Sequence, residues 1–199
     1  MSLRSLPPLL RNEPALTQVI GASNATLAVA TPAQAFVLAG LVRLGSKRPV
    51  LVVTPTGAAA DQLAHDLEAF IDGGRGAGHV DVFPAWETLP FERVSPETST
   101  MGHRLRLLWR LGGGSSGDMG ERPDIVVAPI KAVLQRLGPW RTAARPVELA
   151  KGHRVNVEEL VGQLVAMGYR RESIVEHRGE LAVRGGIVDI FPSTADSRR

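Results

Sequence analysis

The sequence predicts an α/β fold in which a parallel sheet with covering helices is followed by a small α+β domain. The first observation is an alternation of short apolar runs with helical stripes in the first two thirds of the chain. The second is one helix followed by two strands that meet at a Gly-Gly pair. Residues 1–134 hold 12 basic and 12 acidic residues, whereas residues 135–199 hold 11 and 8. We therefore predict two domains, residues 1–137 and 138–199, of which the second is basic.

Four apolar runs predict the strands of the sheet. Each is short and contains β-branched residues, which favour strands. The run PVLVVT is apolar throughout, which predicts that both of its faces are covered. The predicted strands span residues 26–30, 49–54, 79–83 and 124–128.

Helices are predicted between these strands. Thr31 and Pro32 suit the N-cap and first position of the helix after the first strand. Its apolar side is expected to consist of Val37, Leu41 and Leu44. Further helices are expected in an N-terminal arm that ends near Gly21, after an N-cap at Thr56, over residues 99–111 and over residues 129–137.

The loop after the first predicted strand is where a P-loop protein would bind nucleotide phosphates. Such a loop needs glycine N–H groups around the phosphates, a lysine for the β- and γ-phosphates, and a Ser or Thr for magnesium. This loop has no lysine, and Pro32 has no N–H to donate. We interpret it as a degenerate nucleotide loop, formed by Thr31, Pro32, Ala33, Gln34 and Ala35.

A proline-rich segment, PAWETLPFERVSP at residues 84–96, is predicted to form an ordered loop. Its aromatic residues favour anchoring to the core over the alternative, a base-stacking surface beside Arg93 and Arg104. The helix after it is expected to bury Met101, Leu105 and Leu108. Its longest side chains are expected to point into solvent: Arg104, Arg106 and Arg110.

The C-terminal part of the sequence is predicted to form a helix and a hairpin. Asn156 suits the helix N-cap, and Gly168 suits the position after its last turn. The hairpin spans residues 178–192 and turns at the Gly-Gly pair, where glycine reaches positive φ without cost. The pattern alone favours an ordinary half-buried hairpin over a partner-binding site. The charged residues before and within it are expected to be solvated: Glu176, His177 and Glu180.

Composition excludes several classes of site. The absence of cysteine excludes disulfides, cysteine metal sites and cysteine nucleophiles. The five histidines have no spacing typical of metal ligands. No apolar run reaches the ~20 residues that span a membrane, and the N-terminus has no signal-peptide pattern. We therefore expect a cytoplasmic protein without a catalytic or metal site and without membrane contact.

Two stretches of the chain resemble nucleotide-excision-repair proteins. RGELAVRGGIVDIFP, preceded by GYRRESIVEH, is similar to a segment that UvrB and the transcription-repair coupling factor Mfd have in a small UvrA-binding domain. PAWETLPFERVSP and the helix after it are similar to the Mfd family in particular. UvrB differs from this chain in two further ways, since it has an intact P-loop and a long aromatic DNA-binding hairpin. The resemblance runs from about Thr26 to Pro192. It implies an incomplete RecA/P-loop-like sheet followed by a C-terminally truncated UvrA-interaction domain.

The resemblance implies a protein-interaction module that recruits UvrA to a stalled RNA polymerase. Arg171 and Arg184 match arginines that contact UvrA in these families, and guanidinium groups form bidentate bonds with carboxylates. UvrB has another arginine where this chain has Ala182. The remaining candidates for the partner-binding face are Arg170, Arg178 and Tyr169, the last more as a packing residue.

The resemblance also implies that this chain has no ATPase activity and no cofactor of its own. In the full-length family protein, ATP and magnesium belong to C-terminal motor domains, and double-stranded DNA and RNA polymerase are further partners. Two alternatives stay open. A nucleotide-binding helicase half conflicts with the missing P-loop lysine, and a nucleic-acid-binding module has only a net charge of +3 in its favour.

Overall fold

A computed structural model describes residues 2–71, 79–88, 97–114, 121–137 and 146–194. The chain divides into two compact units, and each unit combines two segments of the sequence. The first consists of Met1–Ala85 with Arg110–Arg136, and the second of Trp86–Trp109 with Leu137–Arg199. The domain boundary between residues 137 and 138 stays a prediction.

The first unit is built on a three-stranded parallel sheet with the strand order β1-β3-β2. Its strands are β1 (Val50–Thr54), β2 (Val80–Val82) and β3 (Ile125–Pro129). The ladder of β1 and β3 runs without interruption from the pair Val50 and Ile125 to the pair Thr54 and Pro129. Parallel neighbours cannot be joined by a tight turn, so the connections contain helices. The predicted α/β class is confirmed.

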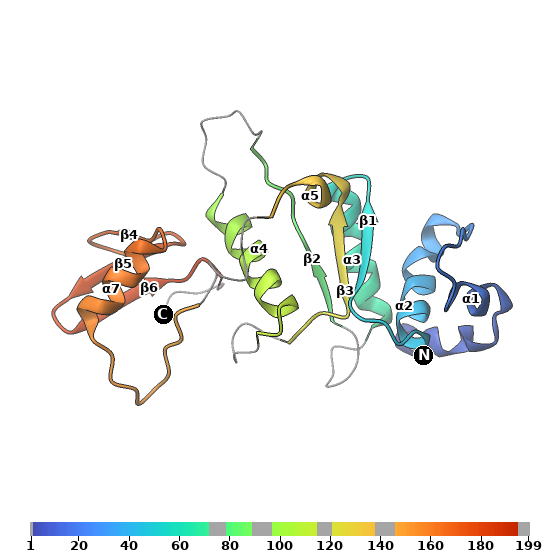
Figure 1. Ribbon diagram of the computed structural model, residues 1–199, viewed down its shortest axis with the longest axis horizontal. Coiled ribbons are helices and arrows are strands. Elements are labelled where there is room, and N and C mark those ends of the chain that lie inside the picture. Colours follow the sequence, from blue (N-terminus) through green and yellow to red (C-terminus); the bar gives the residue numbers. More distant parts are fainter. Residues whose placement is uncertain (1, 72–78, 89–96, 115–120, 138–145, 195–199) are drawn as a thin grey trace. The chain divides into compact units, whose positions relative to one another are not determined.

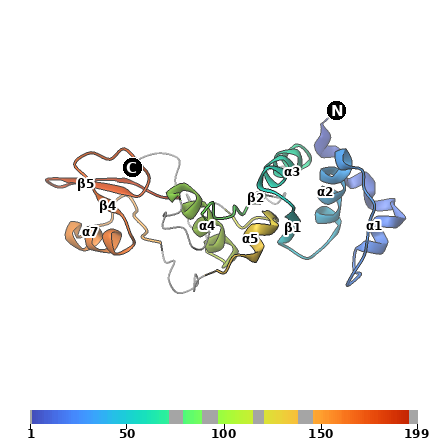
Figure 2. The same ribbon diagram turned by 90° about the horizontal axis from the view of Figure 1, so that it is seen from above.

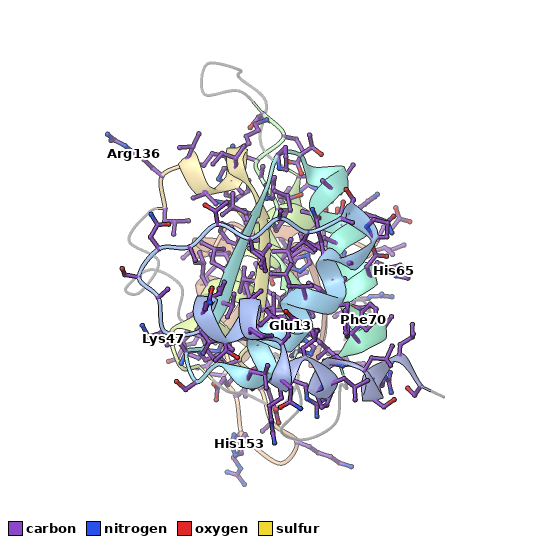
Figure 3. The ribbon with its side chains drawn as sticks, turned by 90° about the vertical axis from the view of Figure 1, so that its right-hand side faces the viewer. Glu13, Lys47, His65, Phe70, Arg136 and His153 are labelled. Carbon is purple, nitrogen blue, oxygen red and sulfur yellow. The ribbon has the colours of Figure 1, made fainter. Side chains whose placement is uncertain are left out.

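Helices α2 (Gln34–Leu44) and α3 (Gly57–Phe70) pack on one face of this sheet. Thr56 caps α3 as predicted, because its side-chain oxygen accepts a hydrogen bond from the N–H of Ala59 at 3.2 Å. Figure 1 shows α3 alongside β1 and β3, and Figure 3 shows the exposed His65 on the outer side of α3. The buried core consists of Ala35, Ala39, Val42, Ala60, Ala64, Leu67, Ile71, Ile125 and Val127.

The N-terminal residues form the predicted helical arm, although in three short pieces. Leu10 packs so closely on Gly40 of α2 that a Cβ at that glycine would overlap the leucine side chain. Leu16 is buried, whereas Leu9 is exposed. The pieces are the 3-10 helices η1 (Leu3–Ser5) and η2 (Pro7–Asn12) and the helix α1 (Pro14–Val19).

The prediction of a strand at residues 26–30 is wrong. These residues belong to neither described sheet, and most of their side chains are exposed. β-Branched residues favour a strand only where a neighbouring strand satisfies the backbone and packs the side chains. The predicted cap at Thr31 is wrong as well, since Thr31–Ala33 form a 3-10 turn, η3, before α2 begins.

Two predictions of burial in the first unit are wrong. The buried side of α2 consists of Ala35, Ala39 and Val42 and not of the larger side chains that define its apolar stripe. Small residues let the helices approach closely, which hydrophobicity alone does not predict. β1 is covered on one face only, because Leu51 and Val53 are 57% and 45% exposed. The helix after β3 is shorter than predicted and spans α5 (Ile130–Leu134).

The second unit contains a three-stranded sheet with one helix packed on it, in agreement with the predicted α+β class. The strand order is β4-β5-β6, with β4 parallel and β6 antiparallel to β5. Figure 2 shows α7 on one side of these strands. The elements are α7 (Val157–Ala166), β4 (Arg170–Arg171), β5 (Glu180–Arg184) and β6 (Ile187–Phe191).

Three local signals in the second unit are confirmed. The side-chain oxygen of Asn156 accepts hydrogen bonds from the N–H groups of Glu158 at 3.0 Å and Glu159 at 3.3 Å. Gly168 follows α7 with a φ of 93°, and Gly185 has a φ of 60° at the turn between β5 and β6. Residues with a Cβ reach such angles only at a cost, so glycine fixes both turns.

The arginines of α4 (Thr98–Leu111) are not all solvated, contrary to the prediction. Arg104 and Arg110 are each 2% exposed. The guanidinium carbon of Arg104 lies 4.5 Å from the ring centre of Trp86. Burial lowers the pKa of Arg104, and the nearby Glu87 opposes this shift. An arginine remains charged under these conditions, so stacking on the ring and the nearby carboxylate compensate its desolvation.

The buried side of α4 agrees with the prediction at Leu108 and differs from it at Met101. Leu107 and Leu108 are buried, whereas Met101 is 39% exposed. Arg110 donates to the carboxylate of Asp81 and to a backbone carbonyl.

Trp86 anchors the start of the proline-rich segment, but Arg93 and the rest of residues 89–96 lie outside the described residues.

Candidate functional site

The sheet of the second unit has two faces that differ in chemistry. Residues directly opposite each other in a ladder point to the same face, so the register assigns each side chain. Leu181, Val183, Val188 and Ile190 form the face packed on α7. The pairs on the other face are Glu180 with Phe191, Ala182 with Asp189, and Arg184 with Ile187.

Three of the predicted site residues lie on this second face, which we call the arginine face. The parallel register pairs Arg170 with Glu180, and their side chains approach to 3.5 Å between Nη2 and Oε1. Arg178 lies with its guanidinium carbon 5.7 Å from the ring centre of Phe191. The arginine face therefore consists of Arg170, Arg178 and Arg184 with the neighbours Glu180, Ala182, Ile187, Asp189 and Phe191.

Arg184 lies at the end of the hairpin and is paired within the sheet. Its Nη2 is 3.2 Å from Oδ2 of Asp189, and the two side chains are 63% and 42% exposed. Exposed ion pairs contribute about 0–1 kcal/mol to folding, so folding does not require this arginine. A guanidinium has five N–H donors. Arg184 can therefore keep its internal partner and still bind a carboxylate from outside.

Arg171 is placed differently from the other candidates. The register pairs it with Leu181, which assigns it to the side of the sheet that faces α7. Its side chain is exposed at the end of β4 and forms no hydrogen bond or ion pair with the part of the chain that the structure describes. The structure thus places Arg170, Arg178 and Arg184 on one face of the sheet, with Arg170 and Arg178 at the Glu180 end of β5 and Arg184 at the turn end. Arg171 belongs to the opposite face.

Tyr169 packs within the second unit. Its ring contacts the core cluster between α7 and the sheet. Its hydroxyl oxygen accepts a hydrogen bond from the N–H of Ser193 at 3.1 Å. The packing role favoured by the sequence agrees with these contacts, because a tyrosine ring in a core still needs a partner for its hydroxyl.

Glu180 is the residue of this face that the sequence did not identify. It was expected to be solvated, but its side chain is only 7% exposed. Its Oε2 accepts hydrogen bonds from the N–H groups of Glu176 at 2.9 Å and His177 at 2.8 Å. These bonds, chiefly the one from Glu176, lower the pKa of Glu180. Strand alternation places Glu180 opposite the core face, so no periodic signal could have predicted its burial.

The five residues of the degenerate nucleotide loop lie at η3 and the start of α2, which begins at Gln34. Thr31, Pro32 and Ala33 form η3, whose N-cap Ala30 has no side-chain acceptor. Ala35 is 4% exposed and belongs to the hydrophobic core. A phosphate site needs several converging N–H groups and a cation, whereas Pro32 has no N–H and the loop has no lysine.

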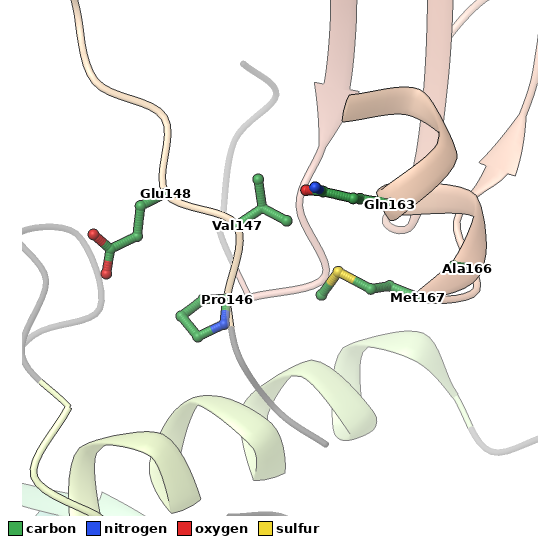
Figure 4. Close-up of a pocket in the computed structure, with 6 residues that line it drawn as sticks. All are labelled: Pro146, Val147, Glu148, Gln163, Ala166 and Met167. Carbon is green, nitrogen blue, oxygen red and sulfur yellow. The ribbon is translucent and has the colours of Figure 1, made fainter. Parts of the chain in front are cut away.

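One surface pocket lies where the segment before α7 passes the end of that helix. It has a volume of about 500 Å³. Figure 4 shows Gln163 and Met167 of the helix end pointing toward Val147 of the passing segment. Among its described lining residues, only Glu148 is ionisable. The lining residues are Pro146, Val147, Glu148, Gln163, Ala166 and Met167.

The described residues contain no group of three or more His, Asp or Glu side chains that could hold a metal ion. None of the helices that the structure describes is long and apolar enough to cross a membrane.

Comparison with known proteins assigns the C-terminal residues of the chain to a family. The UvrB interaction domain family matches residues 147–199. A transcription-repair-coupling factor of Mycobacterium bovis is 39% identical over 171 residues, which cover 86% of this chain and 13% of that protein. One of Staphylococcus aureus strain USA300 is 30% identical over 180 residues, which cover 89% of this chain and 14% of that protein.

The match to the coupling factors extends well beyond the UvrB interaction domain and includes most of the first unit. The chain spans about one seventh of the length of these relatives. The chain is a UvrB-like module of the transcription-repair-coupling factor family, with a UvrB interaction domain over residues 147–199.

Proposed function

We propose that this chain is a protein-interaction module that recruits UvrA during transcription-coupled nucleotide excision repair. The observation that supports this most directly is the match of residues 147–199 to the UvrB interaction domain. The same residues contain α7 and the sheet with the arginine face. The resemblance of the hairpin to UvrA-binding segments makes UvrA the expected partner.

The chemistry of the arginine face suits a protein partner with acidic groups. Arg170 and Arg184 are 69% and 63% exposed, and each has a carboxylate neighbour that orients it. Arginines held in this way lose little side-chain entropy on binding. A few such residues commonly supply most of the binding free energy of an interface. Ile187, 65% exposed beside Arg184, adds an apolar contact.

We further propose that this chain does not hydrolyse ATP and acts in the cytoplasm. The missing lysine and the N–H lost at Pro32 support the first statement. We propose that ATP-driven translocation, with magnesium, and contacts with double-stranded DNA and RNA polymerase belong to other regions of the full-length family protein.

Alanine substitutions of Arg184 and Arg171 test this function. Binding of UvrA to each variant would be measured by isothermal titration calorimetry, with folding checked by circular dichroism. Each change should weaken binding by about 1–3 kcal/mol if the guanidinium pairs with a desolvated carboxylate of the partner. Because the two arginines belong to different faces, their separate losses show how far the interface extends around the sheet.

The matched control is Arg154→Ala, which removes the same charge from an exposed position before α7. It should leave the affinity for UvrA within a factor of about two. Equal losses in all three variants would show a general charge effect and contradict a specific face. Unchanged binding in both Arg184→Ala and Arg171→Ala would contradict the assignment of these residues.

A further inference from the structure

A buried carboxylate lies behind the exposed arginines. The side chain of Glu180 is 7% exposed, and a buried acid is costly unless hydrogen bonds and charges compensate its desolvation. We propose that Glu180 is a positioning residue of the arginine face, whose ionised carboxylate fixes the connection 172–179 and the direction of Arg170. The part of this inference that concerns partner binding rests on the proposed function.

The connection between β4 and β5 needs such an anchor. The two strands are parallel, so the chain must leave the sheet after Arg171 and return before Glu180. The N–H groups of Glu176 and His177, in the middle of this connection, donate to the Glu180 carboxylate at 2.9 and 2.8 Å. Val175 is only 4% exposed beside them. The carboxylate therefore accepts the backbone hydrogen bonds that a neighbouring strand would otherwise accept from this part of the chain.

The same carboxylate orients a candidate contact residue. Its other oxygen, Oε1, lies 3.5 Å from Nη2 of Arg170 and 3.3 Å from Nδ1 of His177. Arg178, the next residue of the returning connection, lies over the ring of Phe191. One buried acid thus ties the connection to the sheet and aligns Arg170 on the face that also presents Arg184.

Positioning and plain electrostatics predict opposite effects of removing this charge. A basic face that attracts an acidic partner only through its net charge would bind more tightly when a glutamate is neutralised. A positioning residue should instead weaken binding when neutralised, because the connection and Arg170 lose their fixed geometry. The sign of the change therefore separates the two explanations.

The test compares Glu180→Gln with Glu176→Gln. Both remove one negative charge from the same region, but the Glu176 side chain is exposed and has no hydrogen bond or ion pair within the described part of the chain. Binding to UvrA should weaken about tenfold in Glu180→Gln and stay level or strengthen in Glu176→Gln. In a background of Arg170→Ala, the loss caused by Glu180→Gln should shrink to roughly twofold, since the residue acts partly through Arg170.

A second measurement needs neither the partner nor the variants. Amide hydrogen exchange of the wild-type chain should show protected N–H groups at Glu176 and His177, although neither residue belongs to a strand. Unprotected exchange there, or a Glu180→Gln variant that binds UvrA as well as Glu176→Gln does, would overturn the proposal. Protection without any binding of wild-type chain to UvrA would support the anchor and reject the proposed function instead.

Discussion

At the scale of single residues, the described part of the second unit contains two buried charged side chains that are compensated by neighbouring groups. Glu180 accepts two backbone N–H bonds, and Arg104 stacks on Trp86. Both were expected to be solvated, because charged residues are mostly exposed and periodicity records only where apolar residues repeat. The partners that compensate each charge are backbone or aromatic groups that the linear pattern does not identify. The burial of such residues therefore cannot be predicted from the sequence pattern.

The stability of the chain should depend on pH through Glu180. The N–H bonds from Glu176 and then His177 lower the pKa of its carboxyl below the ordinary value of about 4.3. The folded state therefore favours the ionised form. Its contribution is present above the ordinary pKa and is lost as pH falls through the lower value of the folded state.

Thermal unfolding of wild type and Glu180→Gln between about pH 6 and pH 3 checks this expectation. The wild-type melting temperature should exceed that of the variant at pH 6, and the difference should shrink as pH falls. A difference that stays constant over this range would show that the carboxyl has the same pKa in both states.

At the scale of elements, the sequence predicted which segments are helical better than it predicted their contacts. Caps at Thr56 and Asn156 and the turn at Gly185 agree with the structure, since each depends on local chemistry. The predicted buried side of α2 was wrong, because the helix packs the small side chains of Ala35 and Ala39 into the core in place of the larger side chains of its apolar stripe. The strand at residues 26–30 failed because strand formation depends on a distant partner.

Two helical glycines offer a matched test of element packing. In α4, a Cβ on Gly102 would collide with the backbone carbonyl of Ser193, which cannot move aside as a flexible side chain can. Gly102→Ala should therefore destabilise the chain by about 1–3 kcal/mol. In α7, a Cβ on Gly162 meets no atom within 4 Å. Gly162→Ala should stabilise it by up to about 1 kcal/mol, because alanine favours helix.

Urea unfolding of the two variants beside wild type measures both effects. A destabilised Gly162→Ala would contradict the open surroundings of that glycine. A neutral Gly102→Ala would contradict the close approach of α4 to the segment around Ser193.

For the whole molecule, the alternation of strands and helices was sufficient to predict the α/β class and the small α+β part. The candidate site was accessible only through resemblance, since the pattern alone favoured an ordinary hairpin. The structure then added what neither could provide: Arg184 and Arg171 belong to opposite faces, and Glu180 lies buried beside Arg170. These contacts depend on the pairing of β4 with β5 across the connection 172–179, and the hydrophobic pattern of the sequence does not indicate this pairing.

The measurement that tests the central claim most directly is calorimetric titration of the wild-type chain with UvrA, beside titrations with ATP and with double-stranded DNA. The account predicts saturable binding of UvrA, no binding of ATP at submillimolar concentration, and at most weak DNA binding. A chain that is folded by circular dichroism, yet binds DNA in a strongly salt-dependent manner and does not bind UvrA, would contradict the account and favour a nucleic-acid-binding module.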